Sequence, residues 1–446
     1  MFENTKLNSI QKTCLSSKPL NLEICGKDEI LFYLENSFKL EEQLYRSIKI
    51  EKAFYENWEK YRHPLYFYLI HSAAFYINKL RKSGANIKQI NIDFEESFAQ
   101  GVDPELNCGV KKINKKPTLK EIWNYRAKVY QIMRDWILTT NLNLPIKKGS
   151  HYWALMMSME HQRIHLETSS LIIRQMPVEY LKAPHDWIMS KWSNNKIKSN
   201  FVKIERELVH FGARNSSEVF TWDNETGSKS VEVDSFFVSN YLVSNSEFMN
   251  FVDDEGYKNS NYWTDEGKTW LQSHHILHPP FWIKKDDKYL YRSLFIEHEL
   301  PDDWPVEVNY YEAMAYVNWK SNKDKTEYRL MSEAEYYVLQ SKCREININA
   351  NLQYSSSTSV NKVKNKINDI RGNVWQWLQT DFYPLPGFEL DDLYLDFSSP
   401  YFNQKYKMLL GGSWISTGTQ LSPFYRLWFR KHIYQNAGIR LVKDVL

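Results

Sequence analysis

Long segments with a helical pattern of hydrophobic and polar residues fill the first part of the chain. Apolar residues recur there at spacings of three and four, which gathers them on one face of a helix. Thr118, after Pro117, resembles a helix cap, and Pro177 stops a later segment. The predicted helices cover residues 28–46, 52–82, 122–139 and 150–175. Four long helices with connections suited to antiparallel neighbours predict a four-helix bundle, whose interior is a usual place for a metal.

The pattern changes after about Phe201, where short aromatic and β-branched segments alternate with turns. Two short helices are predicted there, over residues 244–252 and 310–320, and the rest is expected to be loop and short strand packed by tryptophans. The polar link KWSNNKIK (191–198) between the two patterns indicates a boundary. We therefore expect two domains, residues 1–195 and residues 196–446.

Composition narrows the classes of function. The net charge of +3 over 446 residues is too small to indicate a nucleic-acid or membrane surface. No apolar run approaches the ~18 residues of a transmembrane helix, and the first residues lack the apolar core of a signal peptide. The four cysteines are scattered and form no CxxC pair, which favours free thiols over a disulfide framework. A cytoplasmic protein is expected.

Three histidines are the candidate metal ligands. His161 and His165 stand four residues apart in an apolar, helical segment, so both imidazoles face one side of the helix. His71 lies on the apolar face of an earlier predicted helix. Taken singly, each could be a hydrogen-bonded core histidine, and for His71 alone that is the better interpretation. Three histidines on two helices of one predicted bundle instead favour a site for a divalent metal.

Other polar residues near these positions are weaker candidates. Glu167 is two residues beyond His165 and is poorly placed on the same helical face. We therefore expect it to contact the metal ligands rather than the metal, or to contact the second domain. His63, before Pro64, is expected to be structural. A histidine cluster in a predicted loop has little support as a metal site: His274, His275 and His278.

The second half carries motifs that resemble a known fold. Residues 372–377 (GNVWQW), 411–414 (GGSW) and 436–442 (NAGIRLV) resemble signatures of the formylglycine-generating-enzyme/sulfatase-modifying fold, a C-type-lectin-like domain. That enzyme uses a cysteine pair near its C-terminus, whereas the last cysteine here is Cys343, so its activity is not supported. A helical bundle with HxxxHxE before this fold resembles the nonhaem iron sulfoxide synthases of ergothioneine and ovothiol biosynthesis. The resemblance implies an α+β protein whose bundle is DinB-like.

Within that group the resemblance is greater to the ovothiol type, 5-histidylcysteine sulfoxide synthase. It rests on residues 63–71, 75–80, 160–175, 383–388 and 411–418. The arginine-rich segment of the ergothioneine type is not evident, which favours free cysteine as the sulfur donor. The resemblance implies Fe(II) held by the three histidines, with histidine, cysteine and O2 as substrates and a sulfoxidised C–S adduct as product.

The same resemblance assigns further roles. Tyr383 is the implied donor of a proton or hydrogen atom, although a structural tyrosine beside Pro384 is the alternative. Arg426 and Arg430 could bind substrate carboxylates or, equally, form interdomain salt bridges. Tyr425 and Trp428 are expected to pack.

Departures from the family keep other functions open. Gln376 replaces the usual Glu of GNVWEW, and the chain ends at Leu446, where ovothiol synthases commonly continue into a methyltransferase domain. Any methylation is therefore expected from a separate methyltransferase. An ergothioneine-type synthase acting on N-trimethylhistidine and a non-catalytic binding protein on the same scaffold remain the alternatives.

Overall fold

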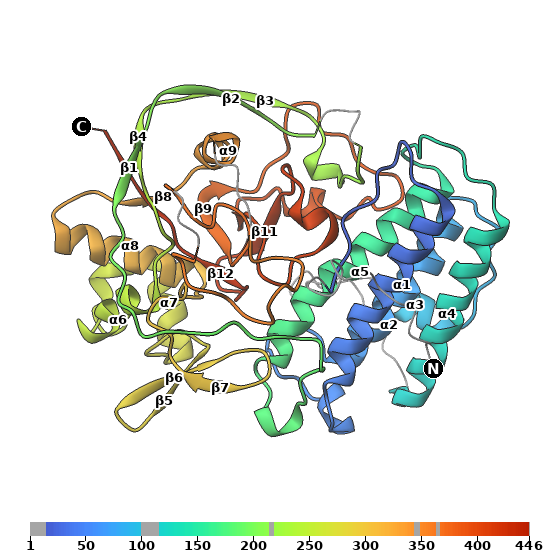
Figure 1. Cartoon of the computed structure of the whole chain (residues 1–446), viewed down its shortest axis with the longest axis horizontal. Coiled ribbons are helices and arrows are strands. Elements are labelled where there is room, and N and C mark those ends of the chain that lie inside the picture. Colours follow the sequence, from blue (N-terminus) through green and yellow to red (C-terminus); the bar gives the residue numbers. More distant parts are fainter. Residues whose placement is uncertain (1–14, 100–115, 214–217, 343–347, 363–365, 446) are drawn as a thin grey trace.

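The computed structural model describes residues 15–99, 116–213, 218–342, 348–362 and 366–445. It divides into a helical region and a mixed region of short strands and helices, which lie side by side in Figure 1. The expected α+β architecture, a helical region followed by a domain of the sulfatase-modifying type, is confirmed. Residues 191–200, which join the two regions, contain neither helix nor strand.

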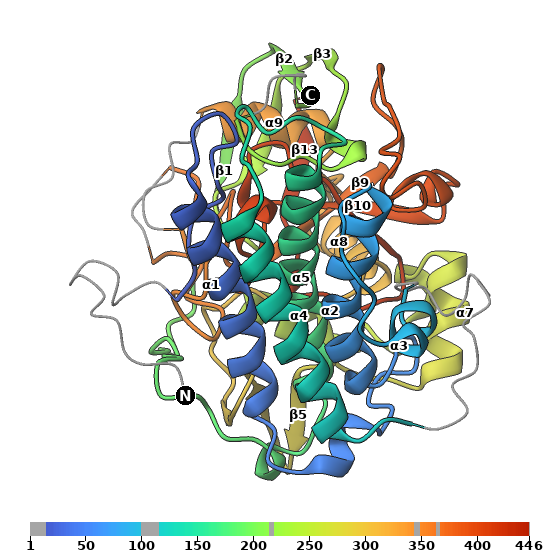
Figure 2. The same cartoon turned by 90° about the vertical axis from the view of Figure 1, so that its right-hand side faces the viewer.

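Four long helices and one short helix form the first region, and Figure 2 shows the long ones packed side by side. They are α1 (Lys27–Arg46), α2 (Leu65–Lys82), α3 (Ile92–Ser97), α4 (Leu119–Thr139) and α5 (His151–Ile173). Thr118 caps α4 as expected: its Oγ1 accepts from the Glu121 amide, and the Glu121 carboxylate accepts from the Thr118 amide. α5 is buried around nearly its whole circumference, because the other helices cover one side and the second region covers the other.

One predicted helix differs from the structure. Residues 52–82 were expected to be continuous, but a 3₁₀ turn (Glu51–Phe54) is followed by irregular chain until α2 begins at Leu65. Pro64 explains the break, because it lacks an N–H and disfavours the helical conformation of the residue before it. The break leaves residues 55–64 free to run along the edge of the second region.

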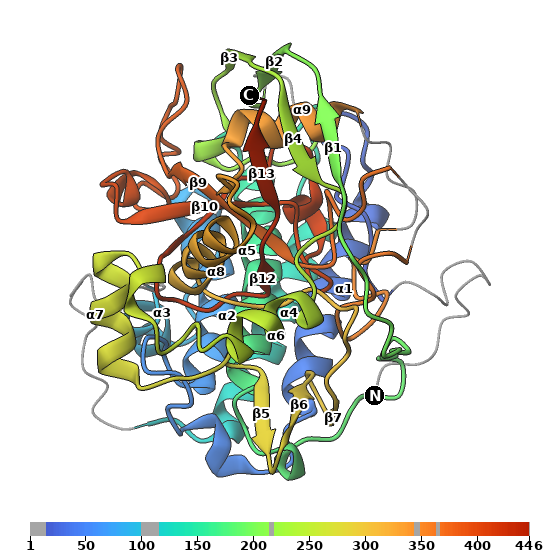
Figure 3. The same ribbon diagram turned by 90° about the vertical axis from the view of Figure 1, so that its left-hand side faces the viewer.

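The second region contains small antiparallel sheets and short helices. In Figure 3 the strands β4 and β13 cross the upper part of this region. One four-stranded sheet has the order β1-β4-β13-β8 and another has the order β11-β10-β9-β12, in which only β12 and β9 are parallel. Their strands are β1 (Phe201–Ile204), β4 (Phe236–Ser239), β13 (Leu441–Asp444), β8 (Arg329–Leu330), β11 (Leu427–Arg430), β10 (Tyr406–Leu410), β9 (Trp375–Asp381) and β12 (Ala437–Gly438).

Two smaller sheets and four helices complete this region within the described residues. The sheets are β2 (Glu207–Phe211) with β3 (Lys229–Val233), and β5 (Trp282–Lys285) with β6 (Lys288–Arg292) and β7 (Glu297–Glu299). The predicted helices at 244–252 and 310–320 correspond to α6 (Asn245–Asp253) and α8 (Tyr310–Asp324). The pattern missed α7 (Asp265–His274) and α9 (Glu333–Lys342). Both are short, at 10 residues each.

Gln376 has a structural role in place of the glutamate of related motifs. Its Oε1 accepts from Nε of the buried Arg440 at 2.7 Å, while its Nε2 donates to the carbonyls of Asp369 and Ile370. A glutamate could accept from Arg440 but could not donate to two carbonyls. The amide therefore suits this position in the core.

The remaining expectations concern cysteines and membranes. Cys25 is a buried free thiol, whereas the first 14 residues and Cys14, Cys108 and Cys343 lie outside the described residues. Within the part of the chain that the structure describes, no helix is both long and apolar enough to cross a membrane.

Candidate metal site and adjoining pocket

Three histidine side chains converge between helices α2 and α5. His71 comes from α2, and His161 and His165 come from α5, where the four-residue spacing directs both rings towards α2. The Nε2 atom of His161 lies 3.2 Å from Nε2 of His71 and 3.2 Å from Nε2 of His165. In the described residues this is the one group of three or more His, Cys, Asp or Glu side chains whose ligand atoms lie close enough together to hold a metal ion.

The surroundings keep these imidazoles neutral. Their side chains are buried, and burial is the main reason that the pKa of each lies below the usual value, at about 4 for His71. His71 Nδ1 bonds to the carbonyl of Phe98 at 2.6 Å, so this nitrogen carries the proton and Nε2 presents a lone pair. Neutral imidazoles whose Nε2 atoms face one another suit a divalent cation, since a metal satisfies lone pairs that the rings cannot satisfy mutually.

Aromatic side chains fix the orientation of the rings. Phe75, one helical turn after His71, stacks on His161 with ring centroids 3.7 Å apart and planes inclined by 7°. Phe67, one turn before His71, stacks on His71 at 5.3 Å. These contacts hold the rings without providing a competing hydrogen-bond partner, so the Nε2 atoms remain directed at one another.

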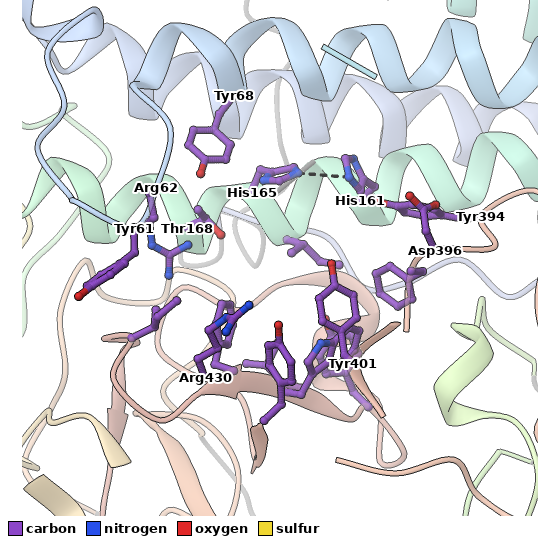
Figure 4. Close-up of a pocket in the computed structure, with 18 residues that line it drawn as sticks. Tyr61, Arg62, Tyr68, His161, His165, Thr168, Tyr394, Asp396, Tyr401 and Arg430 are labelled. Atoms are coloured by element: carbon purple, nitrogen blue, oxygen red, sulfur yellow. Dashed lines mark hydrogen bonds between the residues drawn. The ribbon is translucent and has the colours of Figure 1, made fainter. Parts of the chain in front are cut away.

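His161 and His165 line one wall of a pocket between the two regions of the fold (Figure 4). From the helical region the wall also includes Tyr61, Arg62, Tyr68, Ile164 and Thr168. The second region contributes mainly aromatic side chains, among them Tyr394, Phe397, Tyr401, Tyr406, Tyr425, Trp428 and Phe429. Two charged side chains of the second region, Asp396 and Arg430, complete the polar part of the lining. A pocket at a domain interface beside a possible metal site is a typical place for catalysis.

The structure brings only some of the predicted site residues to this pocket. Arg430 lines it, but Tyr383 and Arg426 do not. The Tyr383 hydroxyl donates to Glu333 at 2.6 Å, and Arg426 is fully buried in an ion pair with the same carboxylate at 2.7 Å. Both therefore point away from the pocket: Arg426 lies in the interior of the second region, and Tyr383 is half-buried beside it. Tyr425, expected only to pack, is part of the lining.

Glu167 contacts the second region directly. Its carboxylate accepts from Trp375 Nε1 and Ser413 Oγ at 2.7 Å each, from Ser416 Oγ at 3.0 Å and from Asn436 Nδ2 at 3.3 Å. Burial raises its pKa and the four donors lower it, with burial the larger effect. This carboxylate connects helix α5 to the GGSW segment, on a different side of the helix from His165.

The other histidines do not join the triad. His63 stacks on Phe67 at 4.1 Å in the turn before α2. His274 ends α7 and its Nε2 lies 3.1 Å from the Tyr61 hydroxyl, whereas the side chains of His275 and His278 are not in the metal-ligand cluster found within the described residues. The expected structural role of His63 fits this position.

Sequence reasoning missed several pocket residues. Phe75 could have been found from its spacing to His71 on one helical face. Arg62, Tyr394 and Asp396 had no local signal, because their place in the pocket depends on how an interhelical loop meets a loop of the other region.

Fold and site together define a class: a helical region that carries a buried three-histidine cluster, joined to a small mixed domain that closes a pocket over it. A family model described as "Sulfatase-modifying factor enzyme 1-like domain" matches residues 194–365 and 338–445. This match covers more than half of the chain, and the chain belongs to that family.

Curated relatives share parts of the sequence. "Hercynine oxygenase" of Mycobacterium tuberculosis is 28% identical over 257 residues, 52% of this chain and 58% of that protein. "Ergothioneine biosynthesis protein 1" of Schizosaccharomyces pombe is 23% identical over 436 residues, 87% of this chain and 53% of that protein. The chain thus spans little more than half the length of these relatives. The alignment with the solved structure of PvdO from Pseudomonas aeruginosa covers 55% of this chain and 94% of that one, at 16% identity and a TM-score of 0.37.

Proposed function

We propose that this protein is an iron- and O2-dependent enzyme that joins the thiol of cysteine to the imidazole ring of histidine or an N-methylated histidine and oxidises the sulfur to a sulfoxide. The observation that carries the proposal is the convergence of three buried, neutral histidines, two of which, His161 and His165, line an interdomain pocket. The names of the relatives support it, since one is a hercynine oxygenase and another belongs to ergothioneine biosynthesis.

The three histidines would hold the metal through their Nε2 atoms. A neutral three-nitrogen set suits Fe(II) and leaves its charge uncompensated, so bound Fe(II) would supply reactivity towards O2 and would lower the pKa of a nearby thiol. The described carboxylates do not complete this cluster. An anionic thiolate substrate is therefore compatible with the charge of the site.

Tyr394 is the proton donor that the geometry supports best, in place of Tyr383. Its ring lies 6.1 Å from the ring of His161, and it lines the same pocket. Burial, reinforced by the negative charge of Asp396, raises the pKa of its hydroxyl, so the phenol stays protonated and can donate. A proton delivered beside His161 would favour C–S bond formation over simple oxidation of the thiol.

The pocket also determines how the reactants would be kept together. Its aromatic walls can stack on an imidazole ring, and two members of the histidine triad, His161 and His165, line the same pocket. Holding two amino acids in one pocket replaces an encounter of several molecules by a reaction between neighbours.

Two compounds are candidates for the imidazole substrate that accepts the sulfur. Hercynine, an N-trimethylated histidine, is favoured by the name of the mycobacterial relative and by the aromatic lining, because quaternary ammonium groups bind well to aromatic faces. Histidine itself is the second candidate, because residues 63–71 and 160–175 resemble the ovothiol type.

The test is anaerobic reconstitution with Fe(II), followed by O2 and each pair of one acceptor, histidine or hercynine, with one donor, cysteine or γ-glutamylcysteine. Mass spectrometry should show an adduct of acceptor and donor carrying one added oxygen. Cysteine sulfinate alone would support the iron site but not the acceptor. Failure to consume O2 with iron bound would contradict the proposal and favour a binding function.

A further inference from the structure

Arg62 is a buried cation at the edge of the candidate site. It lies in the irregular segment before α2, is only 8% exposed and lines the pocket together with His165. In Figure 4 its guanidinium is directed into the pocket towards Arg430, which comes from the other region of the fold. The two regions therefore each place an arginine at the same end of the pocket.

The hydrogen-bonding capacity of Arg62 is hardly used. Its hydrogen bond to the carbonyl of Tyr434 is long at 3.4 Å, its other hydrogen-bond contact is with the neutral Tyr68 hydroxyl, and its guanidinium lies 5.5 Å from the ring of Phe429. No ion pair of Arg62 occurs among the residues that the structure describes.

Other buried arginines are treated differently. Carboxylates pair with Arg126, Arg174 and Arg426 at 2.5–2.7 Å. Arg440 is surrounded by oxygen acceptors of Gln376 and the backbone. Among the described residues, Arg163 and Arg292 are also buried without a carboxylate, but each donates to several neutral oxygen atoms. Arg62 has neither an anion nor such a set of acceptors there, which is unfavourable because the guanidinium has lost water without gaining equivalent partners. Its exposure only towards a pocket indicates that the missing anion is a ligand.

We propose that Arg62 binds the α-carboxylate of an amino-acid substrate, with Arg430 assisting from the opposite wall. This inference rests on the proposed function, which it extends by naming the group that orients a substrate. A carboxylate is favoured because the planar guanidinium offers paired donors that match two carboxylate oxygens. The charge distribution agrees, since the exposed Asp396 lies beside Tyr394 at the far end of the pocket, where an ammonium group could be placed (Figure 4).

Binding to the Fe(II)-loaded protein without O2 tests the inference independently of turnover. Affinities are measured by calorimetry for cysteine and histidine and for their carboxylate-free analogues, cysteamine and histamine. Arg62→Gln removes the charge, and Lys60→Gln is the matched control because Lys60 is an exposed cation two residues away.

For at least one amino acid, Arg62→Gln should weaken binding about 10- to 100-fold. The same variant should leave the carboxylate-free analogue unaffected, and Lys60→Gln should bind like the wild type. The amino acid that shows this coupling identifies which substrate Arg62 holds. Equal losses for amino acids and analogues, wild-type affinity in Arg62→Gln, or no binding of either amino acid to the wild type would each overturn the inference.

Thermal unfolding separates a binding defect from misfolding. Because Arg62 is an unpaired buried charge, Arg62→Met should unfold at the same or a higher temperature than the wild type without ligand, and should lose the stabilisation that the amino acid confers. If binding depends on Arg62 but no sulfoxide forms, the proposed reaction fails while this inference stands. If sulfoxide forms in Arg62→Gln with an unchanged KM for both amino acids, the inference fails while the reaction stands.

Discussion

Two sides of helix α5 carry buried polar residues that differ in their hydrogen-bond partners. One side carries His161 and His165 and faces the pocket, whereas the other carries Glu160 and Glu167 and faces the second region of the fold. Both sides are buried. Their polar atoms differ in whether the protein itself satisfies them.

On the side of Glu160 and Glu167, called the docking side here, the hydrogen-bond partners come from the protein itself. Both Glu167 oxygens accept hydrogen bonds, and Glu160 accepts from Tyr33 and from both the amide and the hydroxyl of Thr419. Gly418 allows this approach: at φ +61° it lies so near Glu160 that an added Cβ would come within 2.5 Å of Oε2. Arg174, just after the helix, pairs with Glu307 at 2.7 Å. These bonds fix the position of one region against the other.

On the pocket side the polar atoms face one another or open space. The three Nε2 atoms converge without an intervening donor, and Arg62 lacks an anionic partner in the described structure. Buried polar groups without partners are costly, so such groups gathered in one place indicate a ligand site. Polar residues with partners in the protein therefore hold this interface together, whereas those without partners indicate where a ligand would bind.

The largest effect is expected from the pocket side. His161→Ala should lower metal affinity by more than about 100-fold, because it removes a ligand outright rather than a supporting bond, and it should abolish turnover. Iron content after anaerobic reconstitution and product formation measure this. His151→Ala, which changes an exposed histidine at the start of the same helix, should retain both, and full iron content in His161→Ala would remove that residue from the ligand set.

Substitutions on the docking side should lower the stability of the fold. Glu167→Ala leaves four buried donors without an acceptor and should lower the free energy of unfolding by at least ~3 kcal/mol. Glu167→Gln keeps an accepting oxygen and should cost about 1–2 kcal/mol. Chemical denaturation of the metal-free variants measures both. A Glu167→Ala protein as stable as the wild type would contradict the assignment of this side to domain docking.

Substitution of two tyrosines compares a residue in the pocket with one outside it. Tyr394→Phe should retain iron but reduce sulfoxide formation about 100-fold, with cysteine sulfinate increasing, because the phenolic proton is lost beside His161. Tyr383→Phe, its matched control, should leave the product ratio unchanged and cost about 1 kcal/mol of stability through the lost bond to Glu333. The two products are quantified by mass spectrometry, and the reverse pattern would return the donor role to Tyr383.

The smallest effect is expected for Lys79 on α2, whose side chain contacts the pocket residue Tyr394. Its Nζ donates to the Leu393 carbonyl at 2.7 Å and lies 3.7 Å from the Tyr394 ring centroid, while burial lowers its pKa to about 7. The unfolded chain therefore binds more protons than the folded chain between pH 7 and about 10.5, and stability should rise with pH in that window.

The comparison with Lys79→Met isolates this contribution. Relative to the variant, the wild type should gain about 1 kcal/mol of unfolding free energy between pH 7 and pH 8. Denaturant unfolding at both pH values measures the difference, in which other titrating groups cancel. Parallel pH profiles would show that Lys79 does not change its protonation there.

Local pattern accounts for much of the helical region. The start of α4 at its Thr118 cap and the pairing of His161 with His165 follow from contacts within three or four residues, which periodicity records directly. The continuous helix expected over residues 52–82 failed at Pro64, although the proline was visible in the sequence. His71 lies beside His161 because α2 packs against α5. The sequence pattern made His71 a candidate ligand but did not determine this packing.

The pocket wall was less accessible to sequence reasoning. Tyr383 and Tyr394 are 11 positions apart in one aromatic segment, yet the hydroxyl of the first bonds to Glu333 away from the pocket, whereas the ring of the second lies 6.1 Å from that of His161. Arg426, just before β11, and Arg430, at its end, differ in the same way: the first pairs with Glu333 and the second lines the pocket. No spacing rule separates such pairs, because the choice depends on which way each loop or strand face is turned after packing.

The sequence by itself determined most of the long helices of the first region, the change of pattern near residue 200 and the two histidines that share a turn of α5, because these depend on neighbours along the chain. Only the tertiary structure decided which tyrosine and which arginines face the pocket, and that Glu167 holds the two regions together. Those outcomes depend on contacts such as Glu160 with Thr419, 259 residues apart, whose geometry exists only after the helices and the small sheets have packed against each other.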